Sequence, residues 1–389
     1  MNFLPISFIQ KRWFAALAKL EFGTLHFTSP EGETTHYRGH QAGPEVRFIM
    51  HDWNVLTRLI ARGDIGLGED YIDGKWESDS VEHLIALFLL NLEHLESFAH
   101  GSWLNRRVFA LYNSFVRRNS RRGSRINIQS HYDVGNDFYR LWLDETMTYS
   151  SALYQGATDL ATAQRNKYAR ILDHLGAPPA QILEIGCGWG GFAEQAAARG
   201  HRTTGITVSP AQYAFARARL GDTADILLQD YRDTHGAFDA IVSIEMFEAV
   251  GEKYWPDYFA SIRENLKPGG SAIIQTITVR DENFADYRSV SDFIRHYVFP
   301  GGMLPSVARF REEAAKAGLQ TREVFSFGQD YAQTLREWLT RFDAARDQVL
   351  AMGYSEAFIR NWRFYLSICA AAFSISRTDV VQVELVHAA

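Results

Sequence analysis

The chain has 389 residues, of which 46% are hydrophobic and 22% are charged, as in a globular protein of two or three domains. This composition excludes a disordered tail, a collagen-like repeat or a coiled coil as the main architecture. Forty basic and 46 acidic side chains give a net charge of -6, so a generally basic nucleic-acid-binding protein is not expected. The two cysteines, Cys187 and Cys369, are too few for a disulfide framework or a zinc site of several cysteines.

The N-terminal part, residues 1–115, predicts a small α+β domain. It is expected to begin with a helix that packs on the domain or touches a membrane face, because apolar side chains recur at helical spacing at Ile9, Trp13, Leu17 and Leu20. Strands are expected over residues 25–28 and 46–50, and helices over 55–61 and 81–90. The glycine-containing segment 63–76 is expected to be a loop without a nucleotide role. No run reaches the ~18 apolar residues of a membrane-spanning helix, and no signal peptide is expected.

A run of arginines marks a predicted linker over residues 116–128. Its members are Arg117, Arg118, Arg121, Arg122 and Arg125, with Gly, Ser and Asn between them. One interpretation is a solvated connector between two domains. The other is a contact for anionic lipid head groups, worth about 1 kcal/mol per basic residue at a charged surface. No stacking or base-reading motif accompanies the run, so nucleic acid is not expected as its partner.

Residues 129–389 predict a larger α/β domain, because helices alternate with short apolar strands from about residue 160. Strands are expected over residues 181–185, 203–208, 226–229, 240–244 and 271–277, and helices over 161–175, 192–199, 211–220 and 257–266. This alternation predicts a parallel sheet with helices on both faces, as in Rossmann-like folds. A ligand is then expected at the carboxyl ends of the first strands.

The strand over residues 181–185 leads into a glycine loop that predicts a cofactor site. Glu184 lies near the end of the strand, and glycines follow at 186, 188, 190 and 191. Glycine allows sharp turns and close approach of a ligand to the backbone. A dinucleotide loop has the spacing G-x-G-x-x-G and an acid after the second strand. Here the spacing is G-x-G-x-G, and Thr207 and Ser209 end the second strand. The pattern resembles the first motif of S-adenosylmethionine-dependent methyltransferases.

Several further segments resemble the cyclopropane-fatty-acyl-phospholipid synthase family. They span residues 130–139, 147–152, 185–191, 229–233, 246–248, 297–305 and 327–331, and include the motifs Tyr-Ser-Ser-Ala, Met-Phe-Glu and Phe-Gly-Gln-Asp-Tyr. The resemblance covers residues 125–389 and, more loosely, the N-terminal part. It implies a class I methyltransferase fold for residues 129–389 and a lipid- or membrane-contacting role for residues 1–115.

The resemblance also implies a reaction. A methyl group passes from S-adenosylmethionine to a cis double bond in the acyl chain of a membrane phospholipid, and a carbocation forms. Loss of a proton from the new methyl group then closes a cyclopropane ring. The protein is expected to be cytoplasmic and peripheral at the inner face of the membrane, with the phospholipid and the membrane surface as partners. A homodimer is among the expected assemblies, whereas no metal and no nucleic acid is expected.

The resemblance assigns bicarbonate as a candidate base and points to five positions around it. Glu248, Tyr331 and the backbone of Ile277 match the family, although each could also be structural, as a helix-start carboxylate, a core tyrosine or part of a strand. Ser151 stands where the family usually has cysteine, and Gln275 where it usually has histidine. Both replacements are polar and can hold an anion through hydrogen bonds.

Cys369 also matches a family cysteine and is a further catalytic candidate. It lies in an apolar run, where a free cysteine often behaves as a small hydrophobic residue. Contacts to S-adenosylmethionine are implied for the residues that match the family's donor site. These are Tyr132 as a wall, Tyr149 and Ser150 at the methionine end, Leu183, Glu184, Gly186, Cys187, Gly188, Gly190 and Gly191 in the loop, Thr207 and Gln212 near the ribose, and Tyr231 and Arg232 near the adenine.

The replacements at Ser151 and Gln275 leave the product open. If a neighbouring carbon loses the proton, the product is a methyl- or methylene-branched unsaturated chain. A catalytically inert lipid-binding homologue is a further alternative. In either active case the carbocation must be kept from water, and aromatic faces favour a nearby cation by about 0.5–2 kcal/mol. Aromatic residues within 293–299 and 362–364, with Trp338 and Phe342, are expected to line an acyl pocket that the loop over 300–305 closes.

Overall fold

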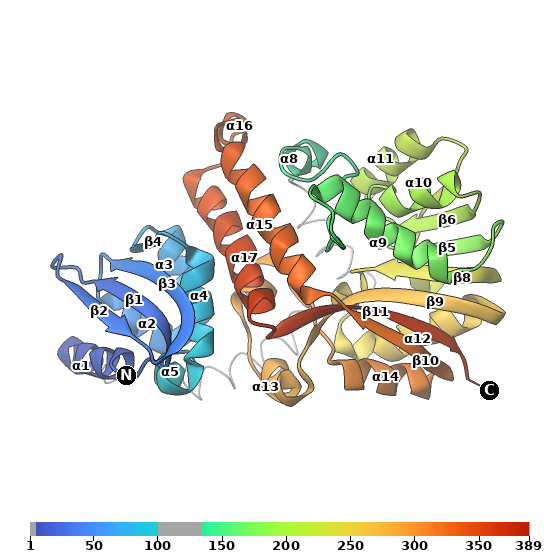
Figure 1. Cartoon of the computed structure of the whole chain (residues 1–389). Helices are drawn as coiled ribbons and strands as arrows, with labels where there is room; N and C mark the ends of the chain where they lie inside the picture. The colour runs from blue at the N-terminus through green and yellow to red at the C-terminus, as the bar shows by residue number, and fades with distance from the viewer. Residues whose placement is uncertain (1–4, 100–133, 389) are drawn as a thin grey trace.

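The structure, a computed structural model, describes residues 5–99 and 134–388 (Figure 1). The described N-terminal part holds a four-stranded sheet with helices around it. The elements are α1 (Ile6–Leu17), β1 (Phe22–Thr28), β2 (Thr34–Arg38), β3 (Gln41–Met50), α2 (Asn54–Arg62), α3 (Asp64–Ile72), β4 (Trp76–Ser78), α4 (Val81–Leu90) and α5 (Leu92–Ala99). The strand order is β2-β1-β3-β4, in which β1 and β3 are parallel and the two outer pairs are antiparallel.

Helix α1 packs on the N-terminal sheet through one face. Ile9, Trp13 and Leu17 are buried, and the Trp13 ring makes edge contacts with Phe27 on β1 and Phe48 on β3. Burying one large aliphatic side chain contributes about 1.5–3 kcal/mol to stability. The expectation of a helix packed on its own domain is confirmed for this face.

The segment 63–76 is not the loop that its glycines predicted, because helix α3 includes both Gly66 and Gly68. A Cβ atom at Gly68 would lie 2.5 Å from the Phe293 ring, and one at Gly66 would lie 2.7 Å from the carbonyl oxygen of Arg58. The helix therefore packs too closely on its neighbours for any larger side chain. This packing outweighs the low helix propensity of glycine.

The second part of the chain holds a seven-stranded sheet. Its strands are β5 (Gln181–Ile185), β6 (Arg202–Thr207), β7 (Asp225–Leu228), β8 (Phe238–Ile244), β9 (Leu266–Val279), β10 (Leu319–Ser326) and β11 (Thr378–His387). The helices are α8 (Asn136–Arg140), α9 (Leu160–His174), α10 (Gly191–Ala198), α11 (Pro210–Leu220), α12 (Trp255–Asn265), α13 (Phe284–Ser289), α14 (Val307–Lys316), α15 (Gly328–Ala344), α16 (Arg346–Ala351) and α17 (Glu356–Ser374). Short helical turns are η1 (Tyr231–Asp233), η2 (Phe247–Ala249), η3 (Glu252–Tyr254), η4 (Asp281–Asn283) and η5 (Ile294–Val298).

The seven strands lie in the order β10-β11-β9-β8-β5-β6-β7. Strands β9, β8, β5, β6 and β7 run parallel, and β11 runs antiparallel to both of its neighbours. Helices α9, α10 and α11 lie above this sheet in Figure 1, and α12 and α14 lie below it. The predicted Rossmann-like fold is confirmed. The chain reverses its direction of progression at β5, between β6 and β8, where a parallel sheet of this kind binds its ligands.

Helices α15 and α17 lie between the two sheets (Figure 1). Helix α17 packs against α3 and α4 of the N-terminal part. Arg336 on α15 donates to Glu82 on α4, from Nε to both carboxylate oxygens at 2.9 and 3.1 Å and from Nη2 at 2.6 Å. The two parts are therefore in direct contact. The predicted linker over 116–128, with its five arginines, and the domain ends at 115 and 129 lie outside the described residues and stay predictions.

Within residues 5–99 and 134–388, we find no helix with the length and apolar character needed to cross a membrane.

Candidate active site

A cavity of about 1040 Å³ opens at the carboxyl ends of β5, β6 and β8. Its first end is lined by the glycine loop after β5 and by η1. Its second end is lined by α13, α17 and the loop over 299–304, and it reaches residues of α4 and α5 in the N-terminal part. The cavity therefore joins the predicted cofactor site to a mostly apolar wall.

The glycine loop has the shape that its sequence predicted. Gly186, Gly188 and Gly190 have φ angles of 81°, 52° and 85°, in the left-handed region that glycine adopts without strain. The N–H groups of Gly186 and Cys187 donate to the carbonyl oxygen of Ile206 on β6, at 2.9 and 3.0 Å. A Cβ atom at Gly188 would meet nothing within 4 Å. The loop thus leaves open space beside its backbone, as a closely bound ligand requires.

Most residues predicted to bind the methyl donor line this cavity. They are Tyr149, Ser150, Glu184, Gly186, Cys187, Gly188, Gly191, Thr207, Gln212, Tyr231 and Arg232. Leu183 is instead fully buried in the core, and Gly190 caps α10 at a point where a Cβ atom would lie 2.9 Å from Leu220. These two residues shape the loop and are not part of the cavity lining. Tyr132 lies outside the described residues.

The structure adds lining residues that the sequence did not identify, among them Ile206, Val208, Gln229 and Asp230. Asp230 accepts hydrogen bonds from Arg232, from Nε at 2.9 Å and from Nη2 at 2.7 Å. The guanidinium of Arg232 is therefore held in place by its own neighbour. Thr207 similarly donates to Gln212 Oε1 at 3.0 Å. Both pairs present a preorganised polar surface at the donor end of the cavity.

Glu184 and Lys167 are two buried ionisable groups close to the glycine loop. Burial raises the pKa of Glu184 to about 8, and the charge of Lys167 opposes that shift. Burial lowers the pKa of Lys167 to about 7, against the influence of Glu245, Asp144 and Glu184. Lys167 donates to Ser150 Oγ at 2.6 Å, whereas Glu184 Oε2 is buried without a hydrogen-bond partner in the described part of the chain. Such an unpaired carboxylate oxygen fits a cationic ligand.

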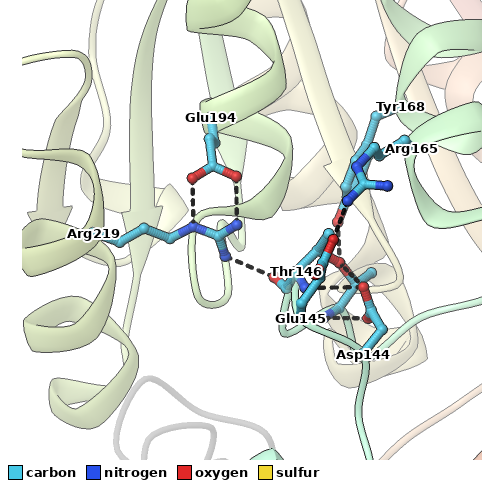
Figure 2. Close-up of polar contacts among 8 residues, drawn as sticks. Asp144, Glu145, Thr146, Arg165, Tyr168, Glu194 and Arg219 are labelled. Atoms are coloured by element: carbon cyan, nitrogen blue, oxygen red, sulfur yellow. Dashed lines mark hydrogen bonds and ion pairs between the residues drawn. The ribbon is translucent and has the colours of Figure 1, made fainter. Parts of the chain in front are cut away.

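The segment that carries Tyr149 and Ser150 is fixed by the polar contacts in Figure 2. Arg219 donates to Glu194 from Nε at 3.0 Å and to the carbonyl oxygen of Thr146 from Nη1 at 2.7 Å. Asp144 accepts the backbone N–H of Thr146 at 2.9 Å, and the Thr148 hydroxyl lies 2.8 Å from that of Tyr168. Helices α9, α10 and α11 thus position this segment at the cavity without contributing a reactive group.

Two carboxylates follow β8 and reach the cavity. Glu245 is the first residue after the strand, and Glu248 lies in η2. Phe247 anchors the turn between them, since its ring is fully buried and stacks on Trp255 with 5.3 Å between centroids. Both glutamates are deep in the protein yet retain some accessible surface, because they line the cavity.

Glu248 makes the contacts expected of a buried anion. Its Oε1 accepts the backbone N–H of Ile277 at 2.6 Å and the Thr276 hydroxyl at 3.0 Å. Its Oε2 is buried without a hydrogen-bond partner among the described residues. Burial and, to a smaller extent, the nearby charge of Glu245 together raise the pKa of Glu248 to about 8. The structure thus places Glu248 and the backbone of Ile277 together, as the sequence predicted.

Glu245 is a site residue that the sequence analysis missed. Its Oε1 accepts the backbone N–H of Ser151 at 2.8 Å and Nε2 of Gln275 at 2.7 Å, and its Oε2 accepts the Tyr331 hydroxyl at 2.7 Å. Burial raises the pKa of Tyr331 well above its ordinary value, so the phenol stays a donor at neutral pH. The sequence did offer one signal for Glu245: it is an acidic residue directly at the carboxyl end of a parallel strand, where such sheets bind their ligands.

These contacts do not fit the bicarbonate ion that the family resemblance implied. Ser151, Gln275 and Tyr331 come together as predicted, but all three donate to Glu245. Ile277 donates to Glu248. A further anion would have to lie beside two carboxylates and would find these donors already engaged. No catalytic step through bicarbonate follows from this arrangement.

Cys369 lines the cavity from α17. Burial raises the pKa of its thiol, so the group stays protonated and is a poor nucleophile. Its position fits an apolar wall residue, and its predicted catalytic role gains no support from its surroundings.

The aromatic residues predicted to line an acyl pocket lie mostly in the core. Phe293, Trp338, Phe342 and Phe364 are fully buried, whereas Phe299 lines the cavity. Helices α15 and α17 contribute to the apolar lining instead, through Leu335, Tyr365, Ile368, Ala372 and Phe373. Aromatic content alone cannot distinguish rings that pack against each other from rings that face a cavity. The loop over 300–305 lines the cavity through Pro300, Gly302, Met303 and Leu304.

The parallel sheet, the glycine loop and the polar donor end of the cavity define an S-adenosylmethionine-dependent methyltransferase. A family model for mycolic acid cyclopropane synthetase matches residues 119–383. The chain is 37% identical to a tuberculostearic acid methyltransferase of Mycobacterium tuberculosis, over 87% of this chain and 83% of the relative. It is also 37% identical to the cyclopropane-fatty-acyl-phospholipid synthase of Escherichia coli, over 84% of each chain. The chain belongs to the mycolic acid cyclopropane synthetase family, which confirms the resemblance found in its motifs.

Solved structures agree with this assignment. A cyclopropane synthase from Mycobacterium tuberculosis superimposes with a TM-score of 0.64 at 30% identity, covering 70% of this chain and 99% of the other. A mycolic acid cyclopropane synthase complexed with SAH and CTAB gives a TM-score of 0.63 at 31% identity, covering 67% of this chain and 97% of the other. The residues around the glycine loop fit the same class of donor, through the open space at Gly188 and the unpaired oxygen of Glu184.

The affinity for S-adenosylmethionine is expected to rise as the pH rises through about 8. The pKa of Glu184 is raised to about 8, so the carboxyl is neutral below that pH and ionised above it. A cationic donor binds the ionised form better, which gives up to about a tenfold gain per pH unit below the pKa. Lys167 loses its proton through about pH 7, which removes a repulsive charge and acts in the same direction.

Isothermal titration of the donor across this pH range measures the effect. Glu184→Gln is expected to bind more weakly and with a flatter pH profile. Glu252→Gln is a matched control, because Glu252 lies outside the cavity lining in a surface ion pair with Arg288. A wild-type affinity that stays constant over the range would contradict the role of Glu184.

Proposed function

We propose that the protein transfers a methyl group from S-adenosylmethionine to a cis double bond in an unsaturated phospholipid acyl chain, and that ring closure gives a cyclopropane fatty acyl chain. The observation that carries this proposal is the continuous cavity. It is lined by the glycine loop, by apolar side chains of α15 and α17, and by the carboxylates of Glu245 and Glu248. The relatives named as cyclopropane synthases support the choice of substrate class.

The donor end of the cavity performs the first task, which is positioning. When bound, the donor supplies a methyl group made electrophilic by a sulfonium. An alkene is a weak nucleophile, so its π bond has to be aligned with the bond that breaks. Holding two reactants in such an arrangement contributes roughly 7–11 kcal/mol. Glu184 offers a carboxylate for a cation, and Lys167 donates to Ser150. The residues just before Tyr149 and Ser150 are held by the contacts in Figure 2.

The apolar end performs the second task, which is to keep the carbocation from water. Ile368 and Ala372 on α17 and Leu335 on α15 give it no lone pair to attack. The rings of Phe299 and Tyr365 lie 6.1 Å apart at the cavity wall and offer faces that favour a cation. The tyrosine hydroxyl is engaged, since it lies 2.9 Å from the hydroxyl of Tyr149.

The second candidate product is a methyl- or methylene-branched unsaturated chain. Two observations favour keeping it. One relative is named a tuberculostearic acid methyltransferase, and the groups around the expected base differ from those implied for a cyclopropane synthase at Ser151 and Gln275. Both products begin with the same methyl transfer and the same carbocation. They differ only in which carbon loses its proton.

A donor with a deuterated methyl group tests the function and the product together. The purified protein is incubated with vesicles of a cis-unsaturated phospholipid, and the fatty acids are analysed by mass spectrometry and by hydrogenation that spares the ring. Ring closure or methylene formation loses one deuterium from the new carbon, whereas loss of a proton from the chain keeps all of them. Absence of product, with donor binding intact, would support an inert lipid-binding homologue instead.

We further propose that the protein works at a membrane surface, from the cytoplasmic side. Ile6 and Phe8 on α1 are 40% and 47% exposed, on the helix whose other face packs on the N-terminal sheet. The arginines at 117–125 could add attraction to anionic lipid. Binding to vesicles with and without anionic phospholipid tests this, and a homodimer would appear as a doubled mass in solution.

A further inference from the structure

Glu245 has a strained backbone that a structural role does not explain. Its φ angle is +50°, in the left-handed region where a side chain other than glycine costs about 1–3 kcal/mol. Its N–H donates to the carbonyl oxygen of Gln275 at 2.8 Å, which fixes this conformation next to β9. In this conformation the carboxylate accepts hydrogen bonds from the backbone of Ser151 and from Tyr331 on α15. Strained residues of this kind cluster at functional sites.

The carboxylate of Glu245 has the partners that an anion would use in this cavity. A backbone N–H, an amide and a phenol donate to it from three separate parts of the chain, namely Ser151, Gln275 and Tyr331. These are three of the five positions that the family resemblance assigned to a bound bicarbonate. Here a side chain of the protein occupies the point on which those donors converge.

A chain of hydrogen bonds from Arg170 through Gln382 sets the orientation of the Gln275 amide. Arg170 on α9 donates from Nη1 to Gln382 Oε1 at 2.9 Å, so the NH₂ group of Gln382 faces away from the guanidinium. Gln382 then donates to Gln275 Oε1 at 3.0 Å. The NH₂ group of Gln275 is left to donate to Glu245 at 2.7 Å. Gln275 therefore presents an N–H donor to the carboxylate of Glu245, because its amide oxygen is already engaged by Gln382.

We infer that the Glu245 carboxylate takes the place of bicarbonate and is the base that removes the proton from the carbocation. The inference rests on the proposed function and adds a catalytic residue to it. Methyl transfer breaks the S–CH₃ bond, whose electron pair stays on sulfur, and the π electrons of the alkene form the new C–C bond. Glu245 then accepts a proton from the cation as a carboxylic acid. The electron pair of the broken C–H bond closes the ring or forms a new double bond.

The charges around Glu245 suit this role. Burial raises its pKa, while Lys167, Tyr331, Gln275 and Ser151 favour the ionised form. The raised pKa makes the group a stronger base than an exposed carboxylate, and its donors oppose that shift and stabilise the ionised form. Glu248 faces the same space with a raised pKa of its own. Binding of a cationic donor favours the ionised form of both.

Two substitutions separate the proton-accepting role from the occupancy of this space. Glu245→Gln keeps the volume of the side chain but removes the base, and turnover is expected to fall by about 10²–10⁴-fold. Glu245→Gly empties the space in front of the three donors and relieves the backbone strain, since glycine adopts φ +50° freely. The relief of strain offsets part of the cost of losing these three hydrogen bonds, so the glycine variant is expected to fold. Glu252→Gln serves again as the control for loss of one carboxylate.

The decisive measurement is the response to bicarbonate in buffer freed of carbon dioxide. Wild-type turnover, followed as S-adenosylhomocysteine release with vesicles of a cis-unsaturated phospholipid, is expected to be unchanged without bicarbonate. Glu245→Gly is expected to be inactive there and to regain turnover as bicarbonate or formate is added. Wild-type turnover that requires bicarbonate, or full activity of Glu245→Gln, would overturn the inference.

A binding measurement keeps the test independent of activity. Bicarbonate is expected to raise the melting temperature of Glu245→Gly and to leave that of the wild type unchanged. A folded glycine variant that responds to no anion, or a wild type that does, contradicts the inference. If the wild type releases no product from any unsaturated phospholipid, the proposed function fails, whereas this binding difference still reports on Glu245.

Discussion

Replacing Glu248 by glutamine is expected to lower turnover by about 10²–10³-fold, as when one preorganised charge-stabilising group is removed from an active site. The carboxylate is held by the N–H of Ile277 and the hydroxyl of Thr276, so it does not have to reorganise when positive charge moves onto the acyl chain. Glutamine preserves the size of the side chain but cannot ionise, so it offers no negative charge to the cation at any pH. The rate of S-adenosylhomocysteine release at saturating donor measures the effect.

Measurements of donor affinity and of folding stability distinguish the loss of turnover in Glu248→Gln from a general defect of the protein. Glu248 lies outside the glycine loop, so the affinity for S-adenosylmethionine is expected to fall by much less than turnover does. Burial raises the pKa of Glu248 from 4.5 to about 8, so the unfolded chain releases this proton at lower pH than the folded one. The free energy of unfolding of the wild type is therefore expected to fall as the pH rises from 4.5 to about 8. Glu248→Gln is expected not to show this fall, because glutamine does not titrate. Glu252→Gln is expected to behave as wild type in all three assays. Unchanged turnover of Glu248→Gln would remove Glu248 from the mechanism.

The fold was largely predictable because its signals are local. The strand over residues 181–185 is β5 with the same bounds, since a short apolar run before a glycine loop specifies both the element and its end. The prediction of a loop over 63–76 was wrong because the deciding contact is not local. Gly66 and Gly68 look like loop residues until Phe293, more than 200 positions away, is seen to pack against the helix.

The candidate site was predictable only where one residue matched a motif. Glu248 follows Met-Phe and was predicted, whereas Glu245 comes directly after the expected strand over 240–244 and matched no motif. What identifies Glu245 is the convergence of donors from Ser151, Gln275 and Tyr331, which are widely separated in the sequence. The same holds for Gln382, whose only signal is its position across from Gln275 on the neighbouring strand. Such contacts depend on strand register and side-chain orientation, which a single sequence does not specify.

Replacing Gly188 by valine is expected to abolish measurable binding of S-adenosylmethionine. A Cβ atom at this position would meet no protein atom within 4 Å, so the added side chain extends into the cavity that the donor has to enter. Turnover is lost with it, because the methyl group has no other source. Isothermal titration with the donor measures the loss directly. No binding is expected even at donor concentrations that saturate the wild type.

Backbone strain has to be separated from occlusion, because Gly188 has a φ angle of +52° and a β-branched residue there costs about 1–3 kcal/mol. Gly221 offers the matching control. It has a φ angle of +53°, a Cβ atom there would also meet nothing within 4 Å, and it is exposed at the end of α11, outside the cavity lining. Gly221→Val therefore carries the same strain and should lower the melting temperature similarly, yet it should bind the donor as the wild type does. If both variants lose the donor equally, strain is the cause; if Gly188→Val still binds it, the glycine loop is not where the donor lies.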